Sequence, residues 1–152
     1  MEANAAPISE APAVSVICPM YNEAGGIERN LRRLLEALNR LDRTWELILV
    51  NDGSSDDSAA RVEALVQKEA RLRMVGYPRN RGRGYALRTG FRLARGAIVV
   101  TTESDLSWGP DIVEKLIAGL ESQDCDMVVA SPHGPGGRLE NVPAHRVFLS
   151  RF

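Results

Sequence analysis

Cysteine is scarce in this sequence, and long apolar runs are missing from it altogether. The two cysteines, Cys18 and Cys125, lie far apart and show neither the pattern of a disulfide framework nor the spacing of metal ligands, so we expect a reducing, cytoplasmic setting. No apolar run exceeds four residues, whereas a transmembrane helix needs about twenty. The N-terminus also lacks the positive start and apolar stretch of a signal peptide. We therefore expect a chain that neither crosses nor enters a membrane by itself.

The sequence has no surplus of either charge. Its 152 residues include 19 Lys and Arg against 20 Asp and Glu, which gives a net charge of −1. The chain as a whole has no electrostatic reason to seek nucleic acid or an anionic membrane. With 44% hydrophobic and 26% charged residues, it has the composition of one globular domain. The aperiodic stretch 1–13 is interpreted as a mobile tail before a domain that covers 14–152.

The alternation of apolar patterns along this domain predicts its fold class. Helical spacing separates short, β-branched runs that are typical of strands, at 14–18, 46–50, 72–75, 97–102 and 126–130. Near-continuous apolar strands separated by helices favour a mostly parallel sheet covered on both faces, a doubly wound, three-layer α/β/α sandwich.

Chemically versatile side chains gather where the first four strands end. They lie in the loops at 19–23, 51–54, 78–84 and 103–105. In doubly wound sheets, ligands bind in the crevice beyond the carboxyl ends of the strands. We therefore expect the four loops to share one rim and to form the functional site.

Two acidic residues, Glu103 and Asp105, follow the fourth strand. If the extended conformation continues past Thr102, their side chains point the same way and one divalent cation could bridge them. Such oxygen ligands suit Mg²⁺ or Mn²⁺, which take further ligands from water and substrate phosphates. The alternative is that both are solvated turn residues, with Asp105 or Ser107 capping the next helix. The position after a buried strand strengthens the metal interpretation, and the residues alone leave both open.

Asp52, at the end of the second strand, also has two interpretations. Its carboxylate could accept a hydrogen bond from a nucleobase N–H, with Glu23 meeting the base or ribose from the neighbouring loop. It could equally form an Asx turn that caps the next helix. The residues alone leave both open.

Arginine dominates the stretch between Ala70 and Thr102, which holds eight arginines and no acidic residue. On the predicted helix, arginines at helical spacing are interpreted as a solvated face, formed by Arg88, Arg92 and Arg95. In the loop at 78–84, called the rim loop below, guanidinium groups and glycine-exposed N–H donors could hold phosphate. The arginines placed to do so are Arg79, Arg81 and Arg83.

Taken together, these motifs resemble glycosyltransferase family 2, and within it the dolichyl-phosphate mannose synthase-like enzymes. The resemblance rests on the segments 14–23, 50–56, 80–90 and 103–106 and runs from Val14 to the C-terminus. It implies a GT-A-type fold and inverting transfer of a sugar from a GDP- or UDP-linked nucleotide-diphospho-sugar. The acceptor that it implies is a polyprenyl or dolichyl phosphate.

The resemblance also implies roles for individual residues. The positions that hold the nucleoside are matched by Pro19, Tyr21, Glu23 and Asp52. The loop residues that the resemblance assigns to the nucleotide-sugar are Arg79, Asn80, Arg81 and Gly82. The metal triad is matched by Glu103, Asp105 and Ser107, of which Asp105 is also assigned as catalytic. The acceptor phosphate is assigned to Arg146 and Ser150.

This chain departs from the pattern of that branch in three ways. Glu103 stands in place of an aspartate and Ser107 in place of a glutamine, which alters the expected metal site. Ser131-Pro132-His133 replaces a Ser-Arg pair, so an expected contact to the acceptor phosphate is missing. The sequence stops at Phe152, before the acceptor-side elements that family members normally carry, so it is either a shortened homologue or a fragment.

The sequence supports two functional hypotheses, and it gives little support to a third. The first is an active, metal-dependent transferase in the cytoplasm or at the cytoplasmic face of a membrane, which an amphipathic segment around 147–149 could contact. The alternative is a non-catalytic nucleotide-sugar-binding module or a truncated, inactive homologue. A nucleic-acid-binding function would rest on the arginines alone and is not expected.

Overall fold

The computed structural model describes residues 11–131, in which strands and helices alternate strictly. In chain order the elements are β1 (Val14–Met20), α1 (Ile27–Leu38), β2 (Trp45–Asn51), α2 (Ser58–Val66), β3 (Leu72–Gly76), α3 (Arg83–Leu93), β4 (Ile98–Thr101) and α4 (Ile112–Ser122). The first four predicted strands are thereby confirmed, with ends that shift by one or two residues. The predicted tail falls largely on residues 1–10, outside the described part of the chain.

β1 lies inside a parallel sheet of order β3-β2-β1-β4. Val16 of β1 pairs with Leu47 of β2 on one side and with Val100 of β4 on the other, and all neighbouring strands run parallel. The chain builds outward from β1 to β3 and then returns across β1 to β4. The strand order therefore reverses between β1 and β4, which is where such sheets open a ligand-binding crevice.

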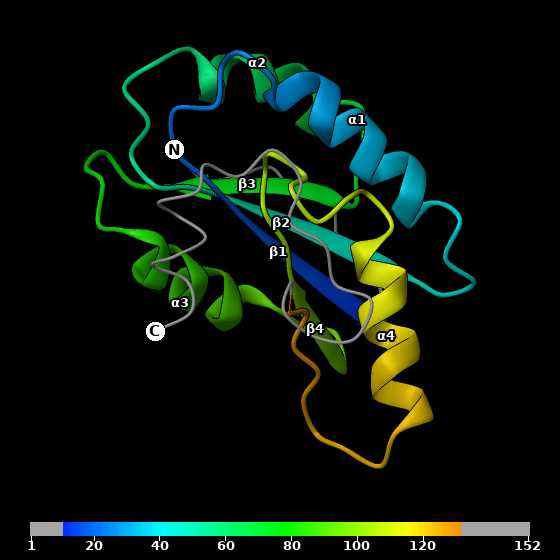
Figure 1. Ribbon diagram of the computed structural model, residues 1–152. Helices are drawn as coiled ribbons and strands as arrows, with labels where there is room; N and C mark the ends of the chain where they lie inside the picture. The colour runs from blue at the N-terminus through cyan, green and yellow to red at the C-terminus, as the bar shows by residue number, and fades with distance from the viewer. Residues whose placement is uncertain (1–10, 132–152) are drawn as a thin grey trace, which may run out of the picture.

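Helices cover both faces of this sheet (Figure 1), with α1, α2 and α4 on one face and α3 on the other. Val16 and Cys18 belong to the larger core beneath α1, α2 and α4. Ile17, between them, points the opposite way and joins Ala86 of α3 in the smaller core. Both faces of β1 are therefore buried, and the prediction of a three-layer α/β/α sandwich is confirmed.

The first strand continues through Pro19, although a proline cannot donate a backbone hydrogen bond. Ile17 directs its carbonyl toward the β4 side, where it accepts from Thr102 N–H at 3.0 Å. Pro19, two residues later, faces the same side but lies beyond the last residue of β4. Its missing N–H consequently breaks no ladder hydrogen bond.

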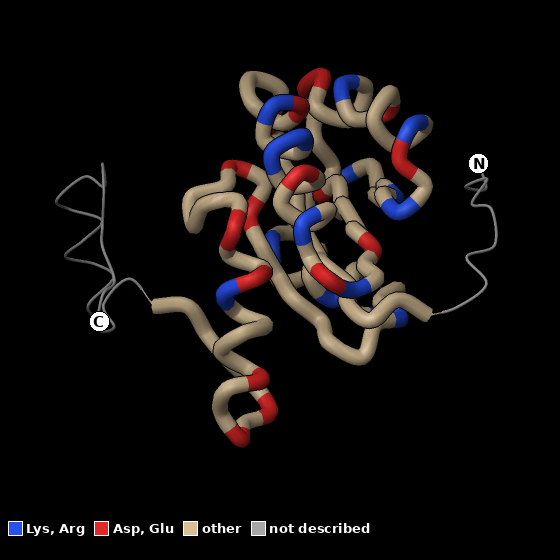
Figure 2. The backbone as a smooth tube through the Cα atoms, turned by 90° about the vertical axis from the view of Figure 1, so that its right-hand side faces the viewer, with Lys and Arg blue, Asp and Glu red and all other residues tan. Residues whose placement is uncertain are grey.

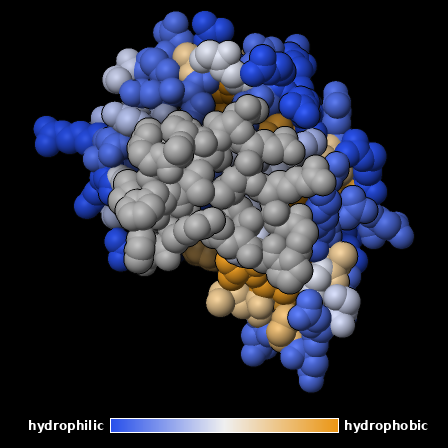
Figure 3. All heavy atoms as spheres, in the orientation of Figure 1, coloured by the Kyte–Doolittle hydropathy of each residue, from blue (hydrophilic) through white to orange (hydrophobic). Residues whose placement is uncertain are grey.

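The fifth predicted strand, at 126–130, is wrong, because the structure shows irregular backbone there. Among the described residues, no strand pairs with the outer edge of β4. Met127 and Val129 are 75% and 72% exposed, and Figure 3 shows an apolar surface in its lower part, where the end of α4 and the following segment lie. The β-branched sequence alone does not make a strand, because strand stability depends on cross-strand neighbours.

One buried carboxylate lies near the start of β2, away from the rim. Glu46 is 1% exposed, and its Oε2 lies 3.0 Å from Arg95 Nη2 and 3.1 Å from Arg73 Nη2. Its Oε1 accepts from the Ser15 hydroxyl at 2.7 Å. Arg95 lies beyond the last residue of α3, so it does not belong to the predicted helical face, and its guanidinium, 39% exposed, neutralises Glu46.

Charged residues of both signs are interspersed over the described backbone (Figure 2). Between residues 11 and 131 the structure contains no helix with the length and apolar character needed to cross a bilayer.

Candidate functional site

A cleft of about 410 Å³ opens at the carboxyl ends of β1, β2 and β4, at the point where the strand order reverses. Its walls come from the loops after these strands and from the start of α3. The residues that line it are Pro19, Met20, Tyr21, Glu23, Asp52, Asn80, Gly82, Arg83, Glu103, Ser104 and Asp105. Four loops that are distant in sequence thus meet at one rim, as the sequence predicts.

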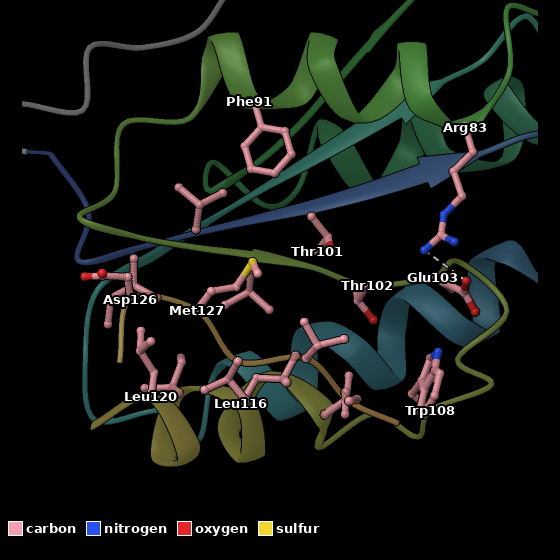
Figure 4. A pocket seen from close by; sticks show the side chains of 18 residues that line it. Arg83, Phe91, Thr101, Thr102, Glu103, Trp108, Leu116, Leu120, Asp126 and Met127 are labelled. Carbon is pink, nitrogen blue, oxygen red and sulfur yellow. Dashed lines mark ion pairs between the residues drawn. The ribbon is translucent and has the colours of Figure 1, made fainter. Parts of the chain in front are cut away.

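A larger cavity of about 590 Å³ lies beside it, between β4, α4 and the segment 126–130 (Figure 4). Its lining is mainly aliphatic and aromatic, and it meets the first cleft at Arg83 and Glu103, which line both. The smaller cleft collects the carboxylates, the amide and the glycine, so we treat it as the candidate site.

The loop after β1 is fixed by hydrogen bonds to the loop after β2. Asn22 N–H donates to Ser54 Oγ at 3.0 Å, and Ser55 N–H donates back to Asn22 Oδ1 at 2.8 Å. Glu23 N–H donates to Ser58 Oγ at 2.7 Å. Asn22 adopts a left-handed conformation with φ of 53°, which asparagine tolerates better than most residues. These contacts hold Glu23 at the cleft.

Asp52 fastens the rim loop to the end of β2. The carboxylate is 3% exposed and accepts from Tyr77 Oη at 2.6 Å, from Asn80 Nδ2 at 3.0 Å and from Arg81 N–H at 2.9 Å. Burial, together with the hydrogen bond to Asp52, raises the pKa of Tyr77, which therefore stays the donor. The alternative of an Asx turn that caps the next helix is wrong for Asp52, because its partners lie on the loop before α3. Its contact to a nucleobase stays a prediction.

Gly53 allows this loop to approach closely. Its φ is +67°, and a Cβ at this position would lie 2.4 Å from the carbonyl carbon of Arg79. Only glycine satisfies both the backbone conformation and the space.

The acidic pair after β4 forms a compact turn. Asp105 Oδ1 accepts from Ser107 N–H at 2.9 Å, and Ser107 Oγ donates to Glu103 Oε2 at 2.7 Å. The buried Asn30 of α1 fixes this turn from below, donating from Nδ2 to the Ser104 carbonyl at 3.1 Å. The capping alternative is wrong for Asp105 and Ser107, because the N-cap of α4 is Asp111.

Negative charge accumulates at this rim. Burial, and after it the charges of Asp105 and Asp56, raise the pKa of Glu23. Burial and the charges of Asp105, Glu103 and Glu23 raise the pKa of the Cys18 thiol to about 12. A thiol with this pKa is neutral at physiological pH, which excludes Cys18 as a nucleophile.

The donor set fits a hard divalent cation. Residues 11–131 contain no group of three or more His, Cys, Asp and Glu arranged to hold a metal ion. Glu103 and Asp105 instead offer two carboxylates beside the Ser107 hydroxyl, all of them oxygen donors. Such a set suits Mg²⁺ or Mn²⁺ when water and phosphate oxygens complete the coordination.

Only some residues of the rim loop line the cleft. Arg81 places its guanidinium 3.8 Å from the centre of the Tyr85 ring, and neither Arg81 nor Arg79 lines the cleft. Asn80 and Gly82 do line it. Gly82 is the N-cap of α3, with no side-chain cap, so backbone donors at this helix start are available to an anion.

Most of the residues that line the cleft were predicted from the sequence, but Met20 and Ser104 were given no site role. Arg83, which the sequence offers as a phosphate candidate, lines the cleft from the first position of α3. Met20 follows Pro19 directly and Ser104 lies between the acidic residues, so adjacency is the signal that could have found both. Arg146 and Ser150 lie outside the described residues, and Ser107 touches the site only through Glu103 and Asp105.

The sequence of this chain matches a family model and several known proteins. A family model described as Glycosyl transferase family 2 matches residues 15–150. The undecaprenyl-phosphate 4-deoxy-4-formamido-L-arabinose transferase of Sodalis glossinidius (strain morsitans) is 37% identical over 116 residues, which cover 76% of this chain and 35% of that protein. The transferase of the same name from Proteus mirabilis (strain HI4320) is 36% identical over 109 residues, covering 71% and 33%.

Two solved structures share the fold. The mannosyltransferase PcManGT from Pyrobaculum calidifontis, in complex with GDP-Man and Mn²⁺, has 33% identity and a TM-score of 0.55, over 64% of this chain and 28% of its own. Glucosyl-3-phosphoglycerate synthase from Mycobacterium tuberculosis, in complex with Mn²⁺, UDP and glucosyl-3-phosphoglycerate, has 28% identity and a TM-score of 0.57, over 74% and 41%.

The family model and the two solved structures place the chain in the class of GT-A-fold glycosyltransferases. The chain belongs to glycosyl transferase family 2. It spans about a third of the length of the curated relatives it matches, 35% in the case of the Sodalis protein. Its resemblance to the dolichyl-phosphate mannose synthase-like branch stays a prediction.

Proposed function

We propose that this chain carries the donor site of a metal-dependent, inverting glycosyltransferase, which moves a sugar from a GDP- or UDP-linked donor to a polyprenyl phosphate. The observation that carries the proposal is the meeting of Glu103 and Asp105 with the nucleotide-side loops at one cleft, with Ser107 hydrogen-bonded to both acidic residues. The relatives named for undecaprenyl phosphate support the choice of acceptor. Action on such a lipid would bring the protein to the cytoplasmic face of a membrane.

The roles of the residues follow from charge. Breaking the sugar–phosphate bond loads negative charge onto the departing nucleoside diphosphate, and a bound Mg²⁺ or Mn²⁺ would supply the positive charge that stabilises it. Glu103, Asp105 and Ser107 would hold the metal, with Asp105 the catalytic member. Gly82 and Asn80 would contact the phosphates, together with Arg79 and Arg81 if these side chains turn inward.

The nucleoside would lie against the ends of β1 and β2. Tyr21 is 46% exposed and offers a ring face for stacking, while Pro19 lines the cleft beside it. Glu23 and Asp52 supply acceptors for base or ribose hydroxyl and N–H groups. An acceptor phosphate is already anionic, so the transfer would need no general base, and Arg146 and Ser150 are proposed to hold it.

Isothermal titration of GDP and UDP, each with and without Mn²⁺, tests this proposal. We expect one nucleotide to bind in a Mn²⁺-dependent way, and Asp105→Asn to weaken that binding by about tenfold or more, because a carboxylate ligand is lost. Asp124→Asn is the matched control, since Asp124 is exposed and outside both cavities. Absence of binding to either nucleotide in the unaltered chain would overturn the proposal.

A non-catalytic nucleotide-sugar-binding module is the second candidate, favoured by the replacement of the usual aspartate with Glu103 and by its ion pair with Arg83. The two candidates differ in turnover. Release of sugar from the bound donor, or its transfer to polyprenyl phosphate in the presence of Mn²⁺, identifies the transferase. Tight binding without either reaction identifies the module.

A further inference from the structure

Glu103 is already neutralised by a basic side chain. Arg83, the first residue of α3, places Nη2 3.1 Å from Glu103 Oε1, and Figure 4 shows the arginine reaching across from α3 to the carboxylate. The other carboxylate oxygen, Oε2, accepts from Ser107 Oγ at 2.7 Å. Both oxygens of the first acidic residue are thus engaged before any cation is bound.

Arg83 and a divalent cation would compete for the Glu103 carboxylate. Two positive groups on one carboxylate repel, so the metal must displace the guanidinium or bind against its charge. The side chain of Arg83 is 62% exposed and that of Glu103 is 32% exposed. Ion pairs of this exposure are weak, so the pair can open when a better partner for either member arrives.

For Arg83, such a partner would be the phosphate of a ligand bound in the same cleft. Of the described residues that line the cleft, Arg83 is the only basic one. It stands at the uncapped start of α3, directly after Gly82, where backbone donors also favour an anion. A guanidinium released from Glu103 can therefore turn to a phosphate oxygen without leaving the cleft.

We infer that Arg83 is an exchangeable counter-ion, which neutralises Glu103 in the ligand-free site and passes to the diphosphate when metal and nucleotide bind together. This inference rests on the proposed function and names the residue that couples its two ligands. Metal alone binds weakly because Arg83 occupies its ligand. Diphosphate removes Arg83 from Glu103 and so strengthens metal binding, and by thermodynamic linkage metal strengthens diphosphate binding by the same factor.

The test compares the unaltered chain with Arg83→Gln, using Mn²⁺ alone as the first probe and the nucleotide that binds best, at saturating Mn²⁺, as the second. Free Mn²⁺ is followed by its paramagnetic resonance signal and nucleotide by calorimetry. We expect Arg83→Gln to bind Mn²⁺ alone about fivefold more tightly, to bind nucleotide more weakly, and to show weaker coupling between them, retaining only the part due to direct contact of metal and phosphate. Arg92→Gln, on the same helix and exposed, is the matched control and should change neither.

The outcomes separate this inference from the proposed function. If Arg83→Gln binds Mn²⁺ as weakly as the unaltered chain, or if neither binds Mn²⁺, the counter-ion role is overturned even where nucleotide binds. If the unaltered chain binds no nucleotide, the proposed function fails, while tighter Mn²⁺ binding by Arg83→Gln would still support the opposition between Arg83 and the metal. Equal coupling in both proteins overturns the exchange.

Discussion

Glu46 illustrates how a single buried charge is kept ionised. Burial alone would raise the pKa of this carboxyl, but hydrogen bonds from Ser15 and Arg95, together with the charge of Arg73, outweigh burial, and the net pKa is lowered. The carboxylate holds the starts of β1 and β2 to the segment after α3, through Arg95 N–H at 3.0 Å. Its value is therefore structural, because it lies at the end of the sheet opposite the cleft.

Replacing this carboxylate tests its contribution to stability. Glu46→Gln should lower the free energy of unfolding at pH 7 by about 2 kcal/mol, because two arginines lose their counter-ion while remaining partly exposed to water. Because the folded-state pKa is lowered, the stabilisation is complete above the unfolded-state pKa of about 4.3 and is lost as the pH falls through the folded-state value. Urea unfolding from pH 7 to pH 3.5 should show the two proteins converging at the acidic end. A constant difference over this range would contradict the assignment.

At the scale of elements, the contact between α3 and β1 depends on one glycine. Gly90 is buried in α3, and a Cβ there would lie 2.3 Å from Ile17 Cγ2. Ile17 is fully buried in a strand that has neighbours on both sides, so it cannot move aside easily. The glycine sets how closely the helix covers this face of the sheet.

Gly90→Ala should therefore lower the free energy of unfolding by about 1–3 kcal/mol, because overpacking outweighs the gain in helix propensity. Gly84→Ala on the same helix is the matched control, since a Cβ added there would meet no other segment within 4 Å, and it should be neutral or slightly stabilising. Thermal or urea unfolding of both variants measures the difference. Equal effects at the two positions would show that the close contact to Ile17 is not limiting.

Periodicity predicts elements well where each element has its partners inside the described chain. The strands from β1 to β4 follow from their apolar runs. β1 and β2 are buried almost throughout, while the edge strands β3 and β4 each bury one residue and pair on one side only. The segment 126–130 has the same kind of sequence but pairs with no strand among residues 11–131; it and β4 both line the larger cavity. A strand needs a hydrogen-bonded neighbour, so the apolar sequence alone does not make one. Pro19 is the converse case, in which a residue that usually ends a strand is tolerated beyond the reach of β4.

The candidate site was predictable to a similar degree and for a similar reason. Parallel strands bring their carboxyl ends to one edge, so Glu23, Asp52, Glu103 and Asp105 could be expected together from their positions alone. The partners of each side chain could not be predicted, because hydrogen bonds such as those that Asp52 accepts join loops whose course the sequence does not specify. The Arg83–Glu103 ion pair depends on the placement of α3 over the sheet and was likewise beyond sequence reasoning.

At the scale of the whole molecule, the two cysteines report on the integrity of the sheet. Cys18 lies in β1 and is fully buried, while Cys125 is exposed. In native buffer at pH 8, we expect a thiol reagent to label one cysteine per chain rapidly and the second only at the rate at which the sheet opens. Denaturant should expose both, and Cys125→Ser should remove the rapid phase alone. Rapid labelling of two thiols in the native protein would contradict the placement of Cys18 in the core.

The Asp52 carboxylate also affects the kinetics of ligand binding. By holding Tyr77, Asn80 and the Arg81 backbone to the end of β2, it gives the cleft a wall that is ordered before a ligand arrives. A ligand meeting such a wall loses little free energy to loop ordering. Its association then needs no preceding rearrangement of this loop, and discrimination between similar ligands is expressed mainly in how long each one stays.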